Sequence, residues 1–233
     1  MIEILSIEPQ QGQGFARVRL AEEESEGVPS IYISTLISGD MWGGEEADRN
    51  REAFFTKVGI DPERVRSLEQ IHSRRVVEAE EIHGRVDADG MISRDRSLVL
   101  AVRVADCYPI FLFDRALGVF AATHSGWRGT GIAGLALDRM RVRYGTDPRD
   151  VAAVLGPGIR RCCYDVPQER AAFFRGEFGK NSVVERDGKE FLDLAAANIS
   201  LLSKRGVESI TSIVDCTSCS PFLGSFRREG PQE

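Results

Sequence analysis

The chain has 233 residues, of which 42% are hydrophobic and 28% are charged, and its formal net charge at pH 7 is -6. This composition is that of a globular protein with its own core, because disordered chains contain fewer apolar residues and a larger net charge. The acidic balance argues against nucleic acid as a partner, because proteins that bind phosphate backbones carry a basic excess or stripe. The apolar runs are too short to cross a bilayer, so no membrane partner is expected.

Cysteine usage and the N-terminal residues indicate a cytoplasmic protein. The five cysteines do not form the even, spaced framework of a secreted disulfide-rich domain. Residues 1–5 contain an early acid and lack the basic and apolar regions of a signal peptide. No linker rich in proline, glycine or serine divides the chain, so we expect residues 1–233 to form a single catalytic domain. The sequence does not indicate its oligomeric state.

Hydrophobic periodicity and turn residues predict a mixture of strands and helices. In chain order the predicted elements are a strand at 31–35, a helix at 45–57, strands at 65–68 and 75–79, strands at 98–104, 109–113 and 118–122, a helix at 129–144, a strand at 151–155, helices at 167–178 and 192–205, and a strand at 210–214. The three closely spaced strands between 98 and 122 are expected to be neighbours in one buried sheet. Because strands and helices do not alternate strictly, this order favours an α/β (α+β) fold with mixed sheets over a doubly wound parallel sheet.

Three side chains that can bind a metal follow predicted strands. His72 and Cys107 each stand a few residues after one, and His124 follows the strand at 118–122. Strand ends in α/β domains hold functional side chains rigidly while the loops keep them accessible. Two histidines and one cysteine suit zinc with a fourth position left for water or substrate, which is a catalytic arrangement. Their spacing matches no short zinc motif, so a buried apolar cysteine and ordinary polar histidines remain an alternative.

A glycine-rich segment, residues 124–131, lies between a predicted strand and a predicted helix. Gly126 and Gly129 allow the backbone to approach a ligand closely, and a helix N-terminus offers free N–H groups to an anion. Arg128 can add a bidentate contact to phosphate. A tight β–α turn with an exposed arginine fits the same residues.

The remaining cysteines are interpreted as having no chemical role. Cys216 and Cys219 form a C-x-x-C near the C-terminus, and no second C-x-x-C completes a structural zinc site. We therefore expect an incidental pair in a turn. The adjacent Cys162 and Cys163 are expected to be structural.

Eight short motifs occur in an order that resembles a known family. They are Gln70-Ile71-His72-Ser73, Asp87-Ala88-Asp89-Gly90, Ala105-Asp106-Cys107-Tyr108-Pro109, His124-Ser125-Gly126-Trp127-Arg128-Gly129, Gly156-Pro157-Gly158-Ile159, Cys163-Tyr164-Asp165-Val166, Asp215-Cys216-Thr217 and Phe226-Arg227-Arg228. Together they resemble the YfiH family, once labelled multicopper polyphenol oxidoreductases or laccases. That family has since been described as zinc-dependent purine nucleoside phosphorylases with adenosine deaminase activity. The matching segments run from about residue 31 to 230.

The resemblance implies a layered α/β/β/α arrangement and zinc held by His72, Cys107 and His124. It also implies phosphorolysis of adenosine, inosine, guanosine and methylthioadenosine with inorganic phosphate, plus adenosine deamination. The pair Asn50-Arg51 is similar to a pair in the family's first helix. Substrate or phosphate binding is therefore expected at Arg51, Ser125, Gly126, Arg128 and Gly129. The segment 222–233 departs from the family pattern.

Other functions remain open. A laccase-like, copper-binding polyphenol oxidase conflicts with the presence of only 3 histidines, although copper can occupy such a site in vitro because it binds more tightly than zinc. A Cys–His hydrolase, such as a peptidoglycan editing factor, would use Cys107 as nucleophile and His124 or His72 as base. A non-catalytic zinc-stabilised module is a further alternative. Zinc deaminases pair the metal with a glutamate in H-x-E, a motif that this chain lacks. The proton carrier for deamination is therefore not identified, and Asp106, beside Cys107, is one candidate for it.

Overall fold

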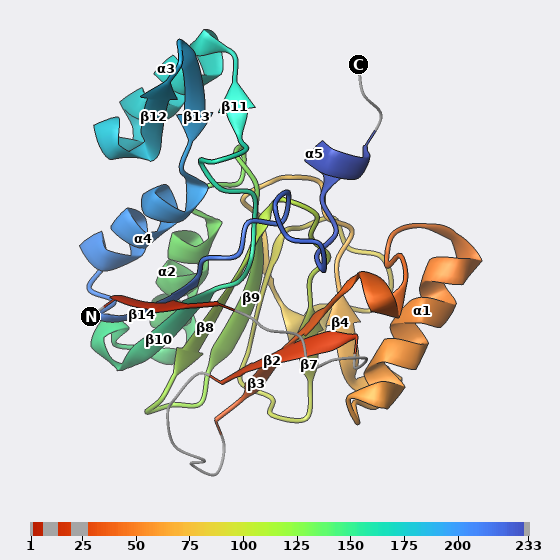
Figure 1. Cartoon of the computed structure of the whole chain (residues 1–233). Coiled ribbons are helices and arrows are strands. Elements are labelled where there is room, and N and C mark those ends of the chain that lie inside the picture. The colour runs from red at the N-terminus through yellow and green to blue at the C-terminus, as the bar shows by residue number, and fades with distance from the viewer. Residues whose placement is uncertain (1, 7–13, 20–27, 231–233) are drawn as a thin grey trace.

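The structure, a computed structural model, describes residues 2–6, 14–19 and 28–230 (Figure 1). Its centre is a seven-stranded mixed sheet in the order β1-β14-β10-β8-β9-β6-β5. These strands are β1 (Ile2–Leu5), β5 (Val76–Glu78), β6 (Gly90–Ser93), β8 (Tyr108–Asp114), β9 (Phe120–Ser125), β10 (Val151–Leu155) and β14 (Ser209–Ile213). The pairs β10–β8, β8–β9 and β9–β6 are antiparallel, and the outer pairs on both sides are parallel.

Three smaller sheets and five helices complete the described part of the chain. The small sheets pair β2 (Phe15–Arg19) with β3 (Ser30–Ser34), β4 (Val65–Ser67) with β7 (Val99–Ala101), and β13 (Lys189–Leu192) with both β11 (Asp165–Val166) and β12 (Val183–Arg186). The helices are α1 (Gly44–Lys57), α2 (Ile132–Tyr144), α3 (Gln168–Phe178), α4 (Leu194–Lys204) and α5 (Phe226–Glu229). Short 3-10 turns occupy η1 (Leu36–Ser38), η2 (Pro62–Arg64), η3 (Ala79–Glu81), η4 (Pro148–Asp150) and η5 (Lys180–Ser182). Within the ranges that the structure describes, no helix is both long and apolar enough to cross a bilayer.

Strand β8 shows why the central sheet is covered on both faces. Successive side chains of a strand point to opposite faces. Ile110 and Leu112 belong to the core cluster that contains residues of α2 and α4, whereas Phe111 packs against the cluster that contains Ile31 of β3. Both neighbouring layers are therefore needed to bury this strand.

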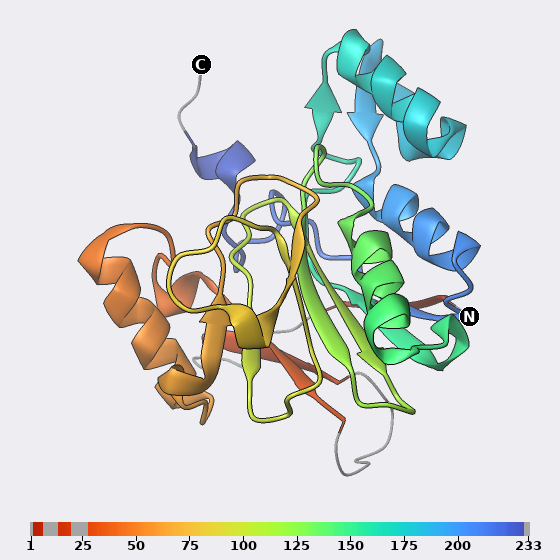
Figure 2. The ribbon, with the colours of Figure 1, turned by 180° about the vertical axis from the view of Figure 1, so that it is seen from behind.

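The layers follow the predicted arrangement. Helices α2 and α4 lie on one face of the central sheet, and the pairs β2–β3 and β4–β7 lie on the other, with α1 outside them (Figures 1 and 2). Met91 and Ile92 of β6 likewise point to different layers, because they belong to different clusters. This confirms the mixed α/β fold with its layered α/β/β/α arrangement.

Two predictions about the strands between 98 and 122 are wrong. Strand β7 pairs in parallel with β4 outside the central sheet, so it is no neighbour of β8, whereas β8 and β9 do pair as expected. A short apolar run has the same periodicity in a central strand and in a half-buried two-stranded pair. His124 lies inside β9 and not after it. The predicted strand ended where the apolar run ends, at residue 122. Strand β9 continues through the polar residues at 123–125, which are all buried.

Candidate metal centre

The structure brings His72, Cys107 and His124 together. One potential ligand atom from each lies within 4.8 Å of the others, and the two imidazole rings meet edge to face with centroids 4.9 Å apart. His124 lies on β9, Cys107 directly precedes the paired strand β8, and His72 lies in the loop between β4 and β5. His124 is buried, Cys107 is half-buried and His72 is exposed, so the group opens to solvent on the side of His72.

A strained backbone positions two residues of this region. His72 has a φ of 59° and Asp106 a φ of 83°, in the left-handed region that side chains other than glycine rarely adopt. Such conformations persist where the surrounding structure enforces them, and they cluster at functional sites. At His72 the restraint is a buried carboxylate. The backbone N–H groups of Ile71, His72 and Ser73 all donate to Asp89, over 3.3, 3.0 and 2.6 Å.

The same carboxylate orients the second histidine. Asp89 Oδ1 lies 2.7 Å from His124 Nδ1, which leaves the Nε2 atom of His124 free to face the other two side chains. A carboxylate behind a histidine is the usual support of a metal-bound imidazole. Burial raises the pKa of Asp89, but hydrogen bonds from His124 and Ser73 outweigh it and lower this pKa to about 2. The residue patterns predicted only a turn at Asp89, and its place inside a family motif was the one signal of a larger role.

The surroundings of Cys107 and His72 favour a cation between them. Burial raises the pKa of the Cys107 thiol to about 12, and the negative charges of Asp106 and Asp89 act in the same direction. Burial lowers the pKa of His72, and the charges of His124 and Arg128 add to this effect, whereas Asp89 opposes it. His72 is therefore a neutral imidazole at pH 7, and the thiol keeps its proton unless a cation stands beside it.

The glycine-rich turn closes directly over these side chains. A Cβ atom at Gly126 would lie 2.8 Å from Cys107 Sγ, and one at Gly129 would lie 3.1 Å from the carbonyl oxygen of Ser73. A side chain at Gly126 would therefore force Cys107 or the turn to shift, and one at Gly129 would press against the Ser73 carbonyl. The expectation of free N–H groups at the following helix is wrong for Gly131 and Ile132, because these donate to Asn198 Oδ1 and to the carbonyl of Gly129.

The other predicted binding residues have different surroundings. Arg128 lies near His72, whose pKa its charge lowers, and its guanidinium carbon is 5.0 Å from the centre of the Trp127 ring. The buried hydroxyl of Ser125 donates to Asn198 Oδ1 over 3.2 Å. Arg51 lies on α1, where it donates to the carbonyl of Met41 and pairs with Asp48. The structure thus brings Arg128 and the two glycines to the group of three, turns Ser125 toward α4, and keeps Arg51 with its own helix.

Two further arginines lie beside the group. Arg227 belongs to one of the family motifs, whereas the sequence patterns did not indicate Arg170. Arg170 lies over the Trp127 ring, 4.5 Å from its centre, and Arg227 lies 5.4 Å from the centre of the Tyr164 ring. Tyr164 itself is close to Cys107: burial raises the pKa of Tyr164, Arg170 lowers it, and Cys107 raises it. A cationic rim formed by Arg128, Arg170 and Arg227 therefore borders the candidate metal centre, in the arrangement that suits an anionic ligand.

Asp106 connects the centre to the C-terminal segment. Its Oδ1 accepts a hydrogen bond of 2.6 Å from Thr217 Oγ1, and its Oδ2 accepts one of 2.7 Å from the backbone N–H of Arg227. Both carboxylate oxygens are thus engaged within the protein. This position does not support the expectation that Asp106 carries a proton in deamination.

The sequence matches a family model and several named relatives. Residues 35–232 match the family model described as multi-copper polyphenol oxidoreductase laccase. A purine nucleoside phosphorylase from Deinococcus radiodurans is 35% identical over 184 residues, which cover 78% of this chain and 72% of that protein. Adenosine deaminase RL5, from an unknown prokaryotic organism, is 33% identical over 195 residues, or 76% and 74% of the two chains.

Solved structures share the fold across nearly the whole chain. The hypothetical protein YfiH of Bacillus licheniformis is 27% identical with a TM-score of 0.76, and the match covers 93% of this chain and 88% of that one. YlmD of Geobacillus stearothermophilus, at 24% identity, has a TM-score of 0.78 over 96% and 94% of the chains, which shows the common fold. The chain therefore belongs to the multi-copper polyphenol oxidoreductase laccase family, in agreement with its resemblance to YfiH.

Proposed function

We propose that this chain is a zinc-dependent purine nucleoside phosphorylase whose metal is held by His72, Cys107 and His124. The observation that carries the proposal is the convergence of these three side chains within 4.8 Å, beside a rim of arginines. The names of relatives at about one third identity support it, since the relative from Deinococcus radiodurans is a purine nucleoside phosphorylase.

The donor set fits zinc better than a multicopper centre. Two imidazole nitrogens and one thiolate are ordinary zinc ligands, and three protein ligands leave a position for substrate. Multicopper oxidases need many imidazoles, and the whole chain contains only 3 histidines. When bound, zinc supplies positive charge that stabilises the negative charge developing in the reaction. Copper is proposed to occupy the same ligands only in vitro.

The chain's own residues are proposed to bind and orient the reactants. In phosphorolysis a phosphate oxygen forms a bond to C1′ of the ribose, the C1′–N9 bond breaks, and the purine leaves after taking up a proton. We assign phosphate binding to Arg128 and Arg170, whose guanidinium groups lie on the Trp127 ring. Asp89 fixes His124 and the 71–73 backbone, and Gly126 allows the turn to pack closely against Cys107. The Gly129 backbone is proposed to border the bound nucleoside. Arg51 and Ser125 are proposed to act only indirectly, because Arg51 bonds to Met41 and Asp48 and Ser125 donates to Asn198.

Adenosine deamination is proposed as a second activity, because the relative RL5 is an adenosine deaminase. It would release ammonia and inosine without phosphate, so the two activities separate in one assay. The alternative of a Cys–His hydrolase is disfavoured, because burial and two carboxylates raise the pKa of Cys107 to about 12. A reactive thiolate needs the opposite environment.

The test is to count metal by mass spectrometry and to assay inosine and adenosine with and without phosphate. The variant His72→Ala is compared with His83→Ala, which removes an exposed histidine from the loop between β5 and β6. We expect phosphate-dependent release of free purine in the wild type and in His83→Ala. His72→Ala should lose both this activity and about one zinc ion per chain. Full turnover by metal-free protein, blocked by alkylation of Cys107, would move the assignment to a Cys–His hydrolase.

A further inference from the structure

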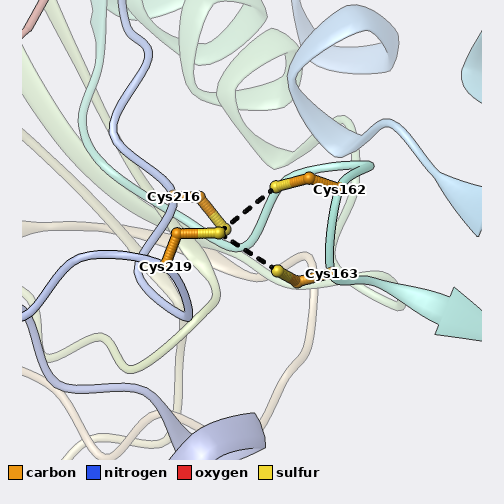
Figure 3. A group of neighbouring side chains, drawn as sticks. All are labelled: Cys162, Cys163, Cys216 and Cys219. Atoms are coloured by element: carbon orange, nitrogen blue, oxygen red, sulfur yellow. Dashed lines mark hydrogen bonds between the residues drawn. The ribbon is translucent and has the colours of Figure 1, made fainter.

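The four cysteines outside the candidate metal centre form a cluster. Cys162 and Cys163 lie in the turn after β10, and Cys216 and Cys219 lie in the turn after β14. Figure 3 shows the four side chains pointing toward one another from these two turns. Cys216 and Cys219, which were expected to be an incidental pair in a turn, thus lie beside a second pair of thiols, although that pair is no C-x-x-C. The sequence concealed the second pair because it is two adjacent cysteines more than 50 positions away.

The sulfur positions match a tetrahedral metal site. All four Sγ atoms lie within 4.8 Å of one another. The Cys219 sulfur is 3.7 Å from that of Cys162 and 3.3 Å from that of Cys163. Zinc–sulfur bonds of about 2.3 Å in a tetrahedron separate the sulfurs by about 3.8 Å. A disulfide would join only two of these atoms, and all five cysteines of the chain are free thiols.

The backbone around the cluster is arranged as in thiolate sites. The N–H of Arg160 donates to Cys216 Sγ over 3.4 Å, and such donors stabilise a thiolate ligand. The N–H groups of Cys219 and Ser220 donate to the carbonyl of Cys216 over 3.1 and 2.9 Å. These bonds close the C-x-x-C turn and fix both of its sulfurs on one side.

Cations surround the two turns and suit the charge of such a site. Four thiolates around a divalent ion leave a net charge of about -2. Arg186 donates to the carbonyl of Cys162 over 3.0 Å, and Arg228 donates to the carbonyl of Thr217 over 2.9 Å. Arg160 extends from the same turn to the carbonyl of Ile213. Three guanidinium groups thus lie next to the cysteine turns.

We propose that Cys162, Cys163, Cys216 and Cys219 bind one Zn²⁺ ion as a structural tetrathiolate site, separate from the His72, Cys107 and His124 group. Four protein ligands leave no open position, which is the arrangement of structural zinc. The site ties the turn after β10 to the turn after β14. It does not depend on the proposed nucleoside chemistry.

The site would support the candidate metal centre from a distance. Thr217, between two of the cysteines, donates to Asp106 Oδ1 over 2.6 Å, and Asp106 adjoins Cys107. The backbone of Arg227 donates to the other oxygen of Asp106. Fixing residues 216–219 therefore fixes the segment that carries Arg227 against the loop that carries Cys107. These four cysteines are positioning residues in this sense and not catalytic ones.

The variant Cys107→Ala isolates the cluster, because the chain has 5 cysteines and the other 4 all belong to it. Produced with zinc under reducing conditions, folded Cys107→Ala should retain about one zinc ion per chain, against about two in the wild type. Its thiols should resist iodoacetamide and should all react after a strong chelator removes the metal. Replacement of zinc by cobalt(II) should give intense sulfur-to-cobalt absorption typical of several thiolates.

A second variant keeps the test decisive if Cys107→Ala does not fold. Cys219→Ser in the wild-type background should lower the zinc content from about two to about one, whereas Ser218→Ala, in the same turn, should leave it unchanged. Folded Cys107→Ala without metal and with four freely alkylated thiols would overturn the proposal. Disulfide-linked peptides between the two turns in the zinc-replete, reduced protein would overturn it as well, and iron in place of zinc would contradict the assignment of the metal.

Discussion

The Nδ1 atom of His124 lies 2.7 Å from Oδ1 of Asp89, and both side chains are buried. This carboxylate also accepts hydrogen bonds from backbone N–H groups of the loop that carries His72. One side chain therefore sets the positions of two proposed ligands at once. It also carries a negative charge at neutral pH, because its pKa is lowered to about 2 against the effect of burial.

Replacing this carboxylate tests its supporting role. Asp89→Asn keeps the shape but removes the charge that orients His124, so zinc affinity at the three-residue centre should fall by about 10- to 100-fold. Competition with a chelator of known affinity measures the change. Asp87→Asn, which alters an exposed carboxylate two residues away, is the matched control and should retain wild-type affinity. Equal affinity in both variants would show that Asp89 does not support the metal.

Gly126 tests the steric requirement above Cys107. Gly126→Ala places a methyl group 2.8 Å from Cys107 Sγ, so the ligand or the turn must move. We expect a loss of stability of about 1–3 kcal/mol and weaker zinc binding at the centre. Gly176→Ala is the control, because a Cβ there meets nothing within 4 Å and the residue lies within α3. That change should raise stability by up to about 1 kcal/mol, as thermal unfolding would show.

Zinc binding at the centre should release a proton. The pKa of Cys107 is about 12, so the thiol is protonated at pH 7 and must lose its proton to become a ligand. Since one proton is displaced, apparent affinity should rise about tenfold for each pH unit between neutral pH and the thiol pKa. Calorimetry in buffers of different ionisation enthalpy gives the number of protons released. Wild type should release about one more than Cys107→Ala, and an equal number would mean that Cys107 is no ligand.

Arg128 tests the proposed phosphate site. Arg128→Gln should raise the KM for phosphate by about tenfold or more, because a charge-assisted hydrogen bond contributes about 1.5–3 kcal/mol. The pKa of His72 should rise, because Arg128 helps to lower it. Arg143→Gln is a matched control, since Arg143 also lies over an aromatic neighbour, Tyr144, but sits on the exposed side of α2. A phosphate KM that is unchanged in Arg128→Gln would remove Arg128 from the proposed site.

Most of the fold was predictable from periodicity, because buried strands and amphipathic helices leave regular apolar patterns. The predicted helix at 45–57 and strand at 151–155 correspond to α1 and β10 within one residue. Pairing between strands was less predictable. The run at 98–104 is as apolar as a strand of the central sheet. In the structure its strand β7 is half-buried and pairs with β4 in a separate two-stranded sheet, which the apolar pattern alone does not reveal. The acidic residues at 21–27 are typical of a solvated turn, but they lie outside the described residues.

The residues of the candidate site were predictable only where their residue type is rare in the sequence. With 3 histidines in the chain, two of them near strand ends, the choice of His72 and His124 was narrow. Asp89, Arg170 and the cysteine cluster were not predictable from the residues. Acidic and basic side chains are common, so their role depends on which distant segments the fold brings together.

The most direct measurement is the rate of free purine release from inosine by zinc-depleted protein before and after zinc is restored, with and without phosphate. We expect no release without zinc, full release when zinc and phosphate are both present, and little release when phosphate is omitted. Undiminished release by protein shown to contain no metal, or no dependence on phosphate, would contradict a zinc-dependent phosphorylase built on His72, Cys107 and His124.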